Sequence, residues 1–151
     1  MRALFVVGRA LFGGFFVYNG VNHFQNAGAL TQYAQAKGVP AAEEAVKATG
    51  ALLIASGLSV MAGIRPRQGL MGIIAFLVPT TLQMHRFWEE EDAEKRQIES
   101  INFSKNVALI GAALTAMQID EPWPAGLDAL SADDEEMFIH LGGRELRSLP
   151  A

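Results

Sequence analysis

Long apolar stretches separated by short polar ones set the pattern of this chain. No charged side chain occurs in residues 48–64 or 106–119, and residues 68–85 carry none apart from any proton on His85. Segments of about 17 to 25 mostly apolar residues are long enough to cross a bilayer as helices. We therefore expect four membrane-spanning helices, at about residues 3–24, 46–64, 68–87 and 103–119.

The first apolar stretch also has the basic start of a secretory signal peptide. Its apolar run is interrupted by Arg9, continues past the length of a typical signal-peptide core, and closes on Asn22 and His23 instead of a cleavage site of small residues. We therefore expect an uncleaved first span. Arg9 lies two turns into it, and we expect its side chain to reach back to the membrane interface or to face the helix bundle.

Small residues recur along three of the predicted spans. They are Gly13 and Gly14 in the first, Ala51, Ala55 and Ser59 in the second, and Ala108, Ala112 and Ala116 in the fourth. Small residues at four-residue spacing let helices approach closely in lipid. We expect these rows to be packing surfaces; the alternative is that Ala and Gly are merely common in spans.

The polar segments predict the connections. Residues 29–37, followed by Gly38, are typical of a short interfacial helix. Residues 65–67 predict a tight basic turn between the second and third spans. Residues 89–100 offer oppositely charged side chains four positions apart, so we expect the third span to continue through them as a solvated helix.

The chain changes character after Ile119. Two prolines flank Trp123, and we expect them to end the last helix and to place this tryptophan at the membrane interface. An acidic extension follows over residues 120–151, with a short helix predicted at about 132–141. We expect residues 1–119 to form the membrane domain and the extension to dock on a neighbouring protein subunit.

Composition excludes several classes of function. The absence of cysteine rules out disulfides, thiol nucleophiles and thiolate metal sites. The net charge of −4 comes largely from the ends of the spans and the tail, and no basic stripe indicates nucleic-acid binding. No phosphate-binding glycine loop, nucleophile elbow or metal-binding motif is present. We therefore expect no metal site and no catalytic activity of the chain on its own.

Polar residues gather at one predicted membrane face, because antiparallel spans bring the ends of the first and third spans beside the starts of the second and fourth. The candidate ligand-binding residues there are Asn19, His23, Thr81, His85, Trp88, Lys105 and Asn106. Asn19 and His23 share one helix face by spacing. Thr81, His85 and Trp88 share another. Such a cluster can bind an anionic or quinone-like headgroup, move protons, or simply hold helix ends together.

Several motifs at these positions occur together in order. They are GRALFGGFF and GVNHF in the first span, YAQAKGVP in the first connection, TGALLIASGL in the second span, FLVPTTLQMHRFW in the third and FSKNVALIGAAL in the fourth. Over residues 4–117 the chain resembles the DoxX family of small four-helix bacterial membrane proteins. The resemblance implies an all-α integral membrane protein: an antiparallel four-helix bundle with short interfacial helices and a polar C-terminal extension.

The resemblance also implies a multi-pass protein of the bacterial cytoplasmic (inner) membrane with both termini in the cytoplasm, although a bare count of basic residues slightly favours the reverse orientation. Relatives serve as subunits of quinone-reducing or quinol-oxidising assemblies. We expect a non-catalytic accessory subunit of a membrane-bound redox complex, in contact with membrane lipids and other subunits. Two alternatives stay open: a quinone-binding oxidoreductase subunit, with quinone or lipid bound at the polar cluster, and, less favoured, a haem b protein with His23 and His85 as axial ligands.

Overall fold

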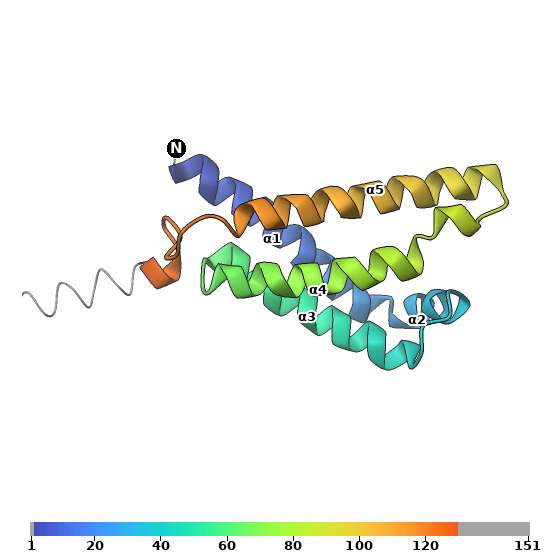
Figure 1. Cartoon of the computed structure of the whole chain (residues 1–151). Coiled ribbons are helices and arrows are strands. Elements are labelled where there is room, and N and C mark those ends of the chain that lie inside the picture. Colours follow the sequence, from blue (N-terminus) through green and yellow to red (C-terminus); the bar gives the residue numbers. More distant parts are fainter. Residues whose placement is uncertain (1, 130–151) are drawn as a thin grey trace, which may run out of the picture.

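The computed structural model describes residues 2–129, and this part of the chain contains helices and no strand (Figure 1). The elements in order are α1 (Arg2–Gln25), α2 (Ala27–Ala36), α3 (Ala42–Ala62), α4 (Pro66–Met84), the 3-10 helix η1 (Phe87–Glu89) and α5 (Ala93–Ala116). The helix predicted at about 132–141 lies outside the described residues. The prediction of an all-helical chain is confirmed for residues 2–129.

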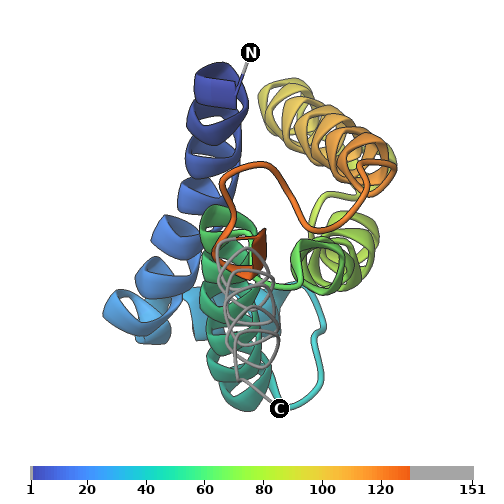
Figure 2. The ribbon, with the colours of Figure 1, turned by 90° about the vertical axis from the view of Figure 1, so that its left-hand side faces the viewer.

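The four long helices lie in a row of neighbours, with α1 against α3, α3 against α4, and α4 against α5 (Figures 1 and 2). The short helix α2 lies across the end of the bundle where α1 and α4 end, and it packs on the start of α3. The two outer helices, α1 and α5, make little contact with each other, and the segment after α5 crosses the space between them (Figure 2). The row is therefore open along one side.

Glycines set the close approach of α1 and α3. A Cβ atom placed on Gly57 would lie 2.6 Å from the carbonyl O of Gly13, and one placed on Gly20 would lie 2.7 Å from the carbonyl O of Gly50. In real proteins, a Cβ atom essentially never lies within 3.0 Å of a heavy atom of another, non-neighbouring residue. The two glycine pairs, spaced by seven residues on each helix, therefore permit a backbone contact that any larger residue would prevent.

The predicted rows of small residues are only partly correct. Gly13 lies at the contact between α1 and α3, but Ala51, Ala55, Ala108 and Ala112 are exposed. The buried row of α3 instead passes through Val46, Gly50, Leu53, Gly57 and Val60. This row is shifted by one residue from Ala51, which rotates the alanines off the packed face.

Two predicted helix boundaries are wrong. α4 ends at Met84 instead of near residue 87, and the chain then turns through η1. The charged segment expected to prolong this helix starts the next one, because the carboxylate of Asp92 accepts a hydrogen bond from the backbone N–H of Lys95 at 2.9 Å and so caps α5 at Ala93. The start of α5 therefore comes ten residues before the expected span at 103–119.

Trp123 also differs from expectation, since we expected it at the membrane interface. It is only 1% exposed and meets the ring of Phe5 edge to face, with ring centroids 5.3 Å apart. The segment after α5 therefore folds back into the bundle, where Trp123 belongs to the apolar core with Phe16, Leu53 and Leu70.

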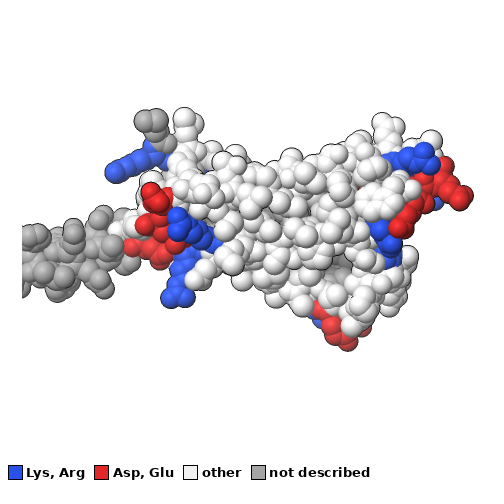
Figure 3. Space-filling view, viewed as in Figure 1, with Lys and Arg blue, Asp and Glu red and all other residues white. Residues whose placement is uncertain are grey.

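The outer surface of the helices is strongly apolar. Leu4, Leu11 and Tyr18, all on α1, are among the most exposed large side chains. Charged side chains gather at the two ends of the molecule and leave a broad uncharged band between them on the face shown in Figure 3. Such a band fits the hydrocarbon layer of a membrane.

By length and composition, two helices within residues 2–129 are apolar enough to cross a membrane, α1 and α3. In the most apolar 18-residue stretch of each helix, the rest of the protein buries only 22% of the residues of α1 and 33% of those of α3. Such low burial is expected for lipid contact and not for the core of a soluble domain. α4 and α5 fall short of the same criterion. α4 carries Arg67 and two glutamines, and α5 carries charged residues in its first turns and Lys105 further on.

Candidate functional site

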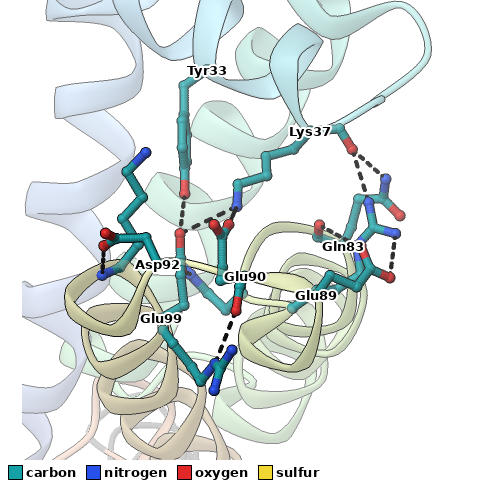
Figure 4. Close-up of polar contacts among 11 residues, drawn as sticks. Tyr33, Lys37, Gln83, Glu89, Glu90, Asp92 and Glu99 are labelled. Carbon is teal, nitrogen blue, oxygen red and sulfur yellow. Dashed lines mark hydrogen bonds and ion pairs between the residues drawn. The ribbon is translucent and has the colours of Figure 1, made fainter.

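Glu99 is the centre of a polar network at the end of the bundle that α2 covers. It lies on the inward face of α5 and is 8% exposed. One carboxylate oxygen, Oε2, lies 2.7 Å from His85 Nδ1. The other, Oε1, accepts a hydrogen bond from Tyr33 Oη at 3.2 Å and lies 3.3 Å from Lys37 Nζ. A single buried carboxylate therefore joins α2, the end of α4 and the start of α5 (Figure 4).

Lys37, the residue that follows the last residue of α2, makes contacts through both its side chain and its backbone. Its Nζ also donates to Glu90 Oε1 at 2.9 Å. Its carbonyl O accepts hydrogen bonds from Gln83 Nε2 at 2.7 Å and Arg86 Nη2 at 3.4 Å. These contacts fasten the end of α2 to the end of α4 and to the turn beyond it (Figure 4).

The shifts in pKa of Glu99, Lys37 and Tyr33 indicate that the network contains charged groups at neutral pH. Burial opposes ionisation of Glu99, but hydrogen bonds from His85, Lys37 and Tyr33 outweigh burial and lower its pKa below the ordinary value. The hydrogen bond to Glu90 raises the pKa of Lys37 despite some burial. Burial, followed by the charge of Glu99, raises the pKa of Tyr33. At pH 7 Glu99 is thus a carboxylate, Lys37 an ammonium and Tyr33 a neutral phenol.

Beside this network lies a partly open cavity of about 360 Å³, lined by residues of α1, α2, α3 and α4. Its walls are mainly apolar, with the Phe76 ring and Pro79 among them. His23 and His85 both line it, from the ends of α1 and α4. Volume, apolar walls and a few convergent polar groups are the usual features of a small-ligand pocket.

Each of the two histidines is oriented by a contact of its Nδ1 atom. His23 Nδ1 lies 2.7 Å from the carbonyl O of Asn19, which can only accept, so Nδ1 carries the proton. The contact of His85 Nδ1 with the Glu99 carboxylate assigns the proton in the same way. In their neutral forms both rings therefore present an unprotonated Nε2, which makes no hydrogen bond within residues 2–129.

Aromatic packing completes the histidine side of the cavity. The ring of His23 meets the ring of Phe76 edge to face, with centroids 5.9 Å apart. A flat ligand ring in the cavity would lie near an aromatic surface and two imidazole rings. The arrangement can accept hydrogen bonds from ligand hydroxyls, or donate to ligand carbonyls when an imidazole is protonated.

The remaining predicted site residues lie in different surroundings. Asn19 orients His23 through its backbone, while its side-chain Nδ2 donates to the carbonyl O of Phe15 at 2.7 Å. Thr81 is buried within α4, and its hydroxyl donates to the carbonyl O of Leu77. Neither Asn19 nor Thr81 lines the cavity.

Three predicted residues lie away from the cavity. Trp88 is 53% exposed on η1, since the break after Met84 removes it from the face of α4, and it packs against the ring of Phe103. Lys105 is exposed and donates to Asn102 Oδ1 at 3.2 Å. Asn106 is buried on α5 and is not a cavity residue either.

Sequence reasoning missed Glu99, because the charged run that contains it reads as a solvated face. A signal was nevertheless present. Glu99, Asn106 and Ala113 are spaced by seven residues and are the three buried positions of α5. This spacing marks one helix face, so a carboxylate in line with a buried amide and a buried alanine points inward. Tyr33 and Lys37 carried no comparable signal.

The fold and the site define a small helical membrane protein with a ligand-sized cavity near one end of its bundle. Residues 4–86, more than half of the chain, match the family DoxX, and the chain therefore belongs to the DoxX family. The matched part runs from α1 to the end of α4 and includes both cavity histidines, while Glu99 lies beyond it. Searches of curated proteins and of solved structures found no match.

Proposed function

We propose that this DoxX protein crosses the bacterial cytoplasmic membrane four times and serves as a small accessory subunit, without catalysis of its own, in a larger membrane-bound redox complex. The observation that carries the accessory role is the way Glu99, Lys37 and Tyr33 bind one another. The Glu99 carboxylate has His85, Tyr33 and Lys37 as partners at 2.7 to 3.3 Å, and these contacts join three helical segments, which is a structural role. The DoxX membership supports the redox context.

Four spans are supported by the alternating direction of the long helices and by the uncharged band between the charged ends (Figure 3). The cytoplasmic side of the termini is proposed from the DoxX resemblance alone. The absence of cysteine makes a direct test simple. Arg2→Cys and Glu91→Cys place single thiols at opposite ends of the bundle. In intact cells a membrane-impermeant maleimide is expected to label Cys at 91 and to spare Cys at 2; labelling of both positions or the reverse pattern would contradict this topology.

The accessory role is tested by purification from the native membrane in mild detergent. We expect a redox protein to co-purify, and its recovery to fall when residues 130–151 are deleted. The deletion starts after Asp128, because Asp128 Oδ2 accepts a hydrogen bond from the backbone N–H of Arg65 at 2.7 Å. Recovery of the protein alone from the native membrane would overturn the accessory role; equal recovery of the partner with the truncated chain would overturn docking through the tail.

A second candidate function, quinone binding, is favoured by the cavity that His23 and His85 line. The unprotonated Nε2 atoms suit the two hydroxyls of a quinol, and the Phe76 ring supplies an aromatic wall. Losing one hydrogen bond of about 1.4 kcal/mol corresponds to a tenfold loss of affinity. We therefore expect His85→Ala to weaken binding of a short-chain quinol about tenfold.

The matched control for this titration is Trp88→Phe, which alters an aromatic residue at the same end but outside the cavity. It is expected to leave quinol affinity unchanged. If the wild-type protein retains no quinone on extraction and binds no quinol, the second candidate fails while the accessory role stands. The bis-histidine haem alternative remains a prediction from the sequence.

A further inference from the structure

Arg9 is a permanently charged residue buried far from the network around Glu99. It is 8% exposed, on the face of α1 that also buries Gly13 and Phe16. Its Nη2 donates to the carbonyl O of Ala125. Its Nε and Nη1 atoms are shielded from solvent and have no hydrogen-bond acceptor among the described residues. A guanidinium in protein does not lose its charge, so a single carbonyl leaves most of its bonding capacity unmet.

Trp123 supplies a second unpartnered donor at the same end of the bundle. Its indole is 1% exposed, and its Nε1–H finds no acceptor within residues 2–129. Buried tryptophans usually satisfy this group. Two side chains from distant parts of the sequence thus bring donors without acceptors to one region.

Arg9 and Trp123 line a common cavity of about 310 Å³. Its other walls are apolar and come from α1, α3, α4 and α5, with Leu4, Val60 and Leu70 among them. It shares no residue with the cavity that holds the histidines. Both α1 and α5 line the cavity, and these two helices make little contact with each other.

We propose that this second cavity binds a lipid that has an acyl chain and an anionic oxygen headgroup, either a carboxylate or a phosphate. Oxygen anions are the acceptors that a guanidinium binds best, because its planar set of donors matches their geometry. The apolar walls accommodate the chain, and the charge of Arg9 selects against lipids without net negative charge. The lipid oxygens accept from the unpartnered nitrogens of Arg9 and Trp123.

The main competing explanation is that Arg9 serves only to hold the segment after α5 through Ala125. Its Nη1 also lies close to Gly63, where an added Cβ atom would clash with it. This explanation accounts for Nη2 but leaves Nε, Nη1 and Trp123 Nε1 without acceptors. It also predicts no dependence on lipid charge, which makes the two explanations separable.

The chain has two tryptophans, so its own fluorescence can report on the cavity. In Trp88→Phe the sole remaining indole is Trp123. We expect a brominated fatty acid or brominated phosphatidylglycerol, titrated into the full-length protein in detergent, to quench this fluorescence saturably. Half-saturation is expected at a concentration at least about tenfold lower than with brominated phosphatidylcholine. The anionic lipid that saturates first identifies the headgroup as carboxylate or phosphate.

Trp123→Phe is the matched control, because Trp88 then reports on general partition of the brominated lipid into the micelle. Its quenching should rise without saturation and should not distinguish the three lipids. Equal half-saturation by phosphatidylcholine and both anionic lipids at Trp123, or quenching there without saturation, would overturn the proposal.

A pair of glycine substitutions separates occupancy of the cavity from folding. A Cβ atom at Gly8 or at Gly111 meets no atom within 4 Å, but only Gly8 lines the cavity. In the Trp88→Phe background, Gly8→Leu should raise the half-saturation concentration at least about tenfold, and Gly111→Leu should leave it unchanged. Arg9→Gln should abolish the preference for anionic lipids. Unaltered binding by Gly8→Leu would overturn the site even if Arg9→Gln fails to fold.

Discussion

Replacing Glu99 with glutamine tests whether one buried carboxylate holds three elements together. The substitution keeps the shape of the side chain but removes its charge, and the new amide group faces donors on Lys37 and His85. Removing one partner of a buried ion pair costs about 3 to 5 kcal/mol. Lys37 keeps its contact with Glu90 at 2.9 Å and the network touches solvent, so we expect the lower end, about 3 kcal/mol.

For a chain of this size, about 3 kcal/mol lowers Tm by roughly 6 to 12 °C. The assay is thermal unfolding in detergent followed by far-UV circular dichroism. Glu91→Gln removes the same charge from an exposed position ahead of α5 and should change Tm by less than about 2 °C. Equal shifts for the two variants would refute the structural role assigned to Glu99.

The pH dependence supplies a second check on the same variant. Because the pKa of Glu99 is lower in the folded protein than its ordinary value of 4.5, its stabilisation is fully present above about pH 4.5 and is lost as the pH falls through the folded pKa. The raised pKa of Lys37 keeps its contribution intact below about pH 10. The difference between wild type and Glu99→Gln should therefore shrink as the pH falls below about 4.5. A difference that persists at pH 2 would contradict the assignment.

Three further substitutions probe separate parts of the fold. Gly57→Ala should lower Tm by an amount equivalent to about 2 kcal/mol, because the new methyl group meets the carbonyl O of Gly13. Its control, Gly111→Ala, should be neutral or stabilising, because the new methyl group meets no atom. Similar shifts in Tm for the two variants would show that α1 and α3 can move apart. Thr81→Val should lower the free energy of unfolding by less than about 1 kcal/mol and leave quinol affinity unchanged, since the Thr81 hydroxyl donates only within its own helix. A tenfold change in quinol affinity would place Thr81 in the binding site. Asp92→Ala should cost about 1 kcal/mol in thermal unfolding through loss of the helix cap, and no change in Tm would discount the cap.

The long helices were predictable because uncharged stretches and the charges between them are local features of the sequence. Antiparallel threading then sufficed to place His23 and His85 at one end, where both line the same cavity. The break at His85 was not predictable in this way. A charged run with helical spacing can prolong the helix before it or start the helix after it, and the choice is settled by the cap at Asp92 and the inward side chain of Glu99.

Packing details depended on information that spacing alone lacks. Alanine and glycine are equivalent in a rule about small residues, yet only glycine permits the backbone contact between Gly13 and Gly57. Trp123 illustrates the same limit. A tryptophan between prolines fits a membrane interface by composition, and its burial against Phe5 follows from the direction in which the chain turns after α5.

The open row of helices makes the four long helices unequal. α3 packs against α1, α2 and α4, whereas α5 has a single long neighbour, α4. Polar contacts hold α5 near both ends: Glu99 near its start, and the carbonyl O of Met117, just past its end, which accepts from Arg67 Nε at 3.2 Å. Local opening follows such differences in contact. We therefore expect backbone amides of α5 to exchange with solvent deuterium before those of α3, and the bundle to open first on its α5 side while α1 and α3 remain paired.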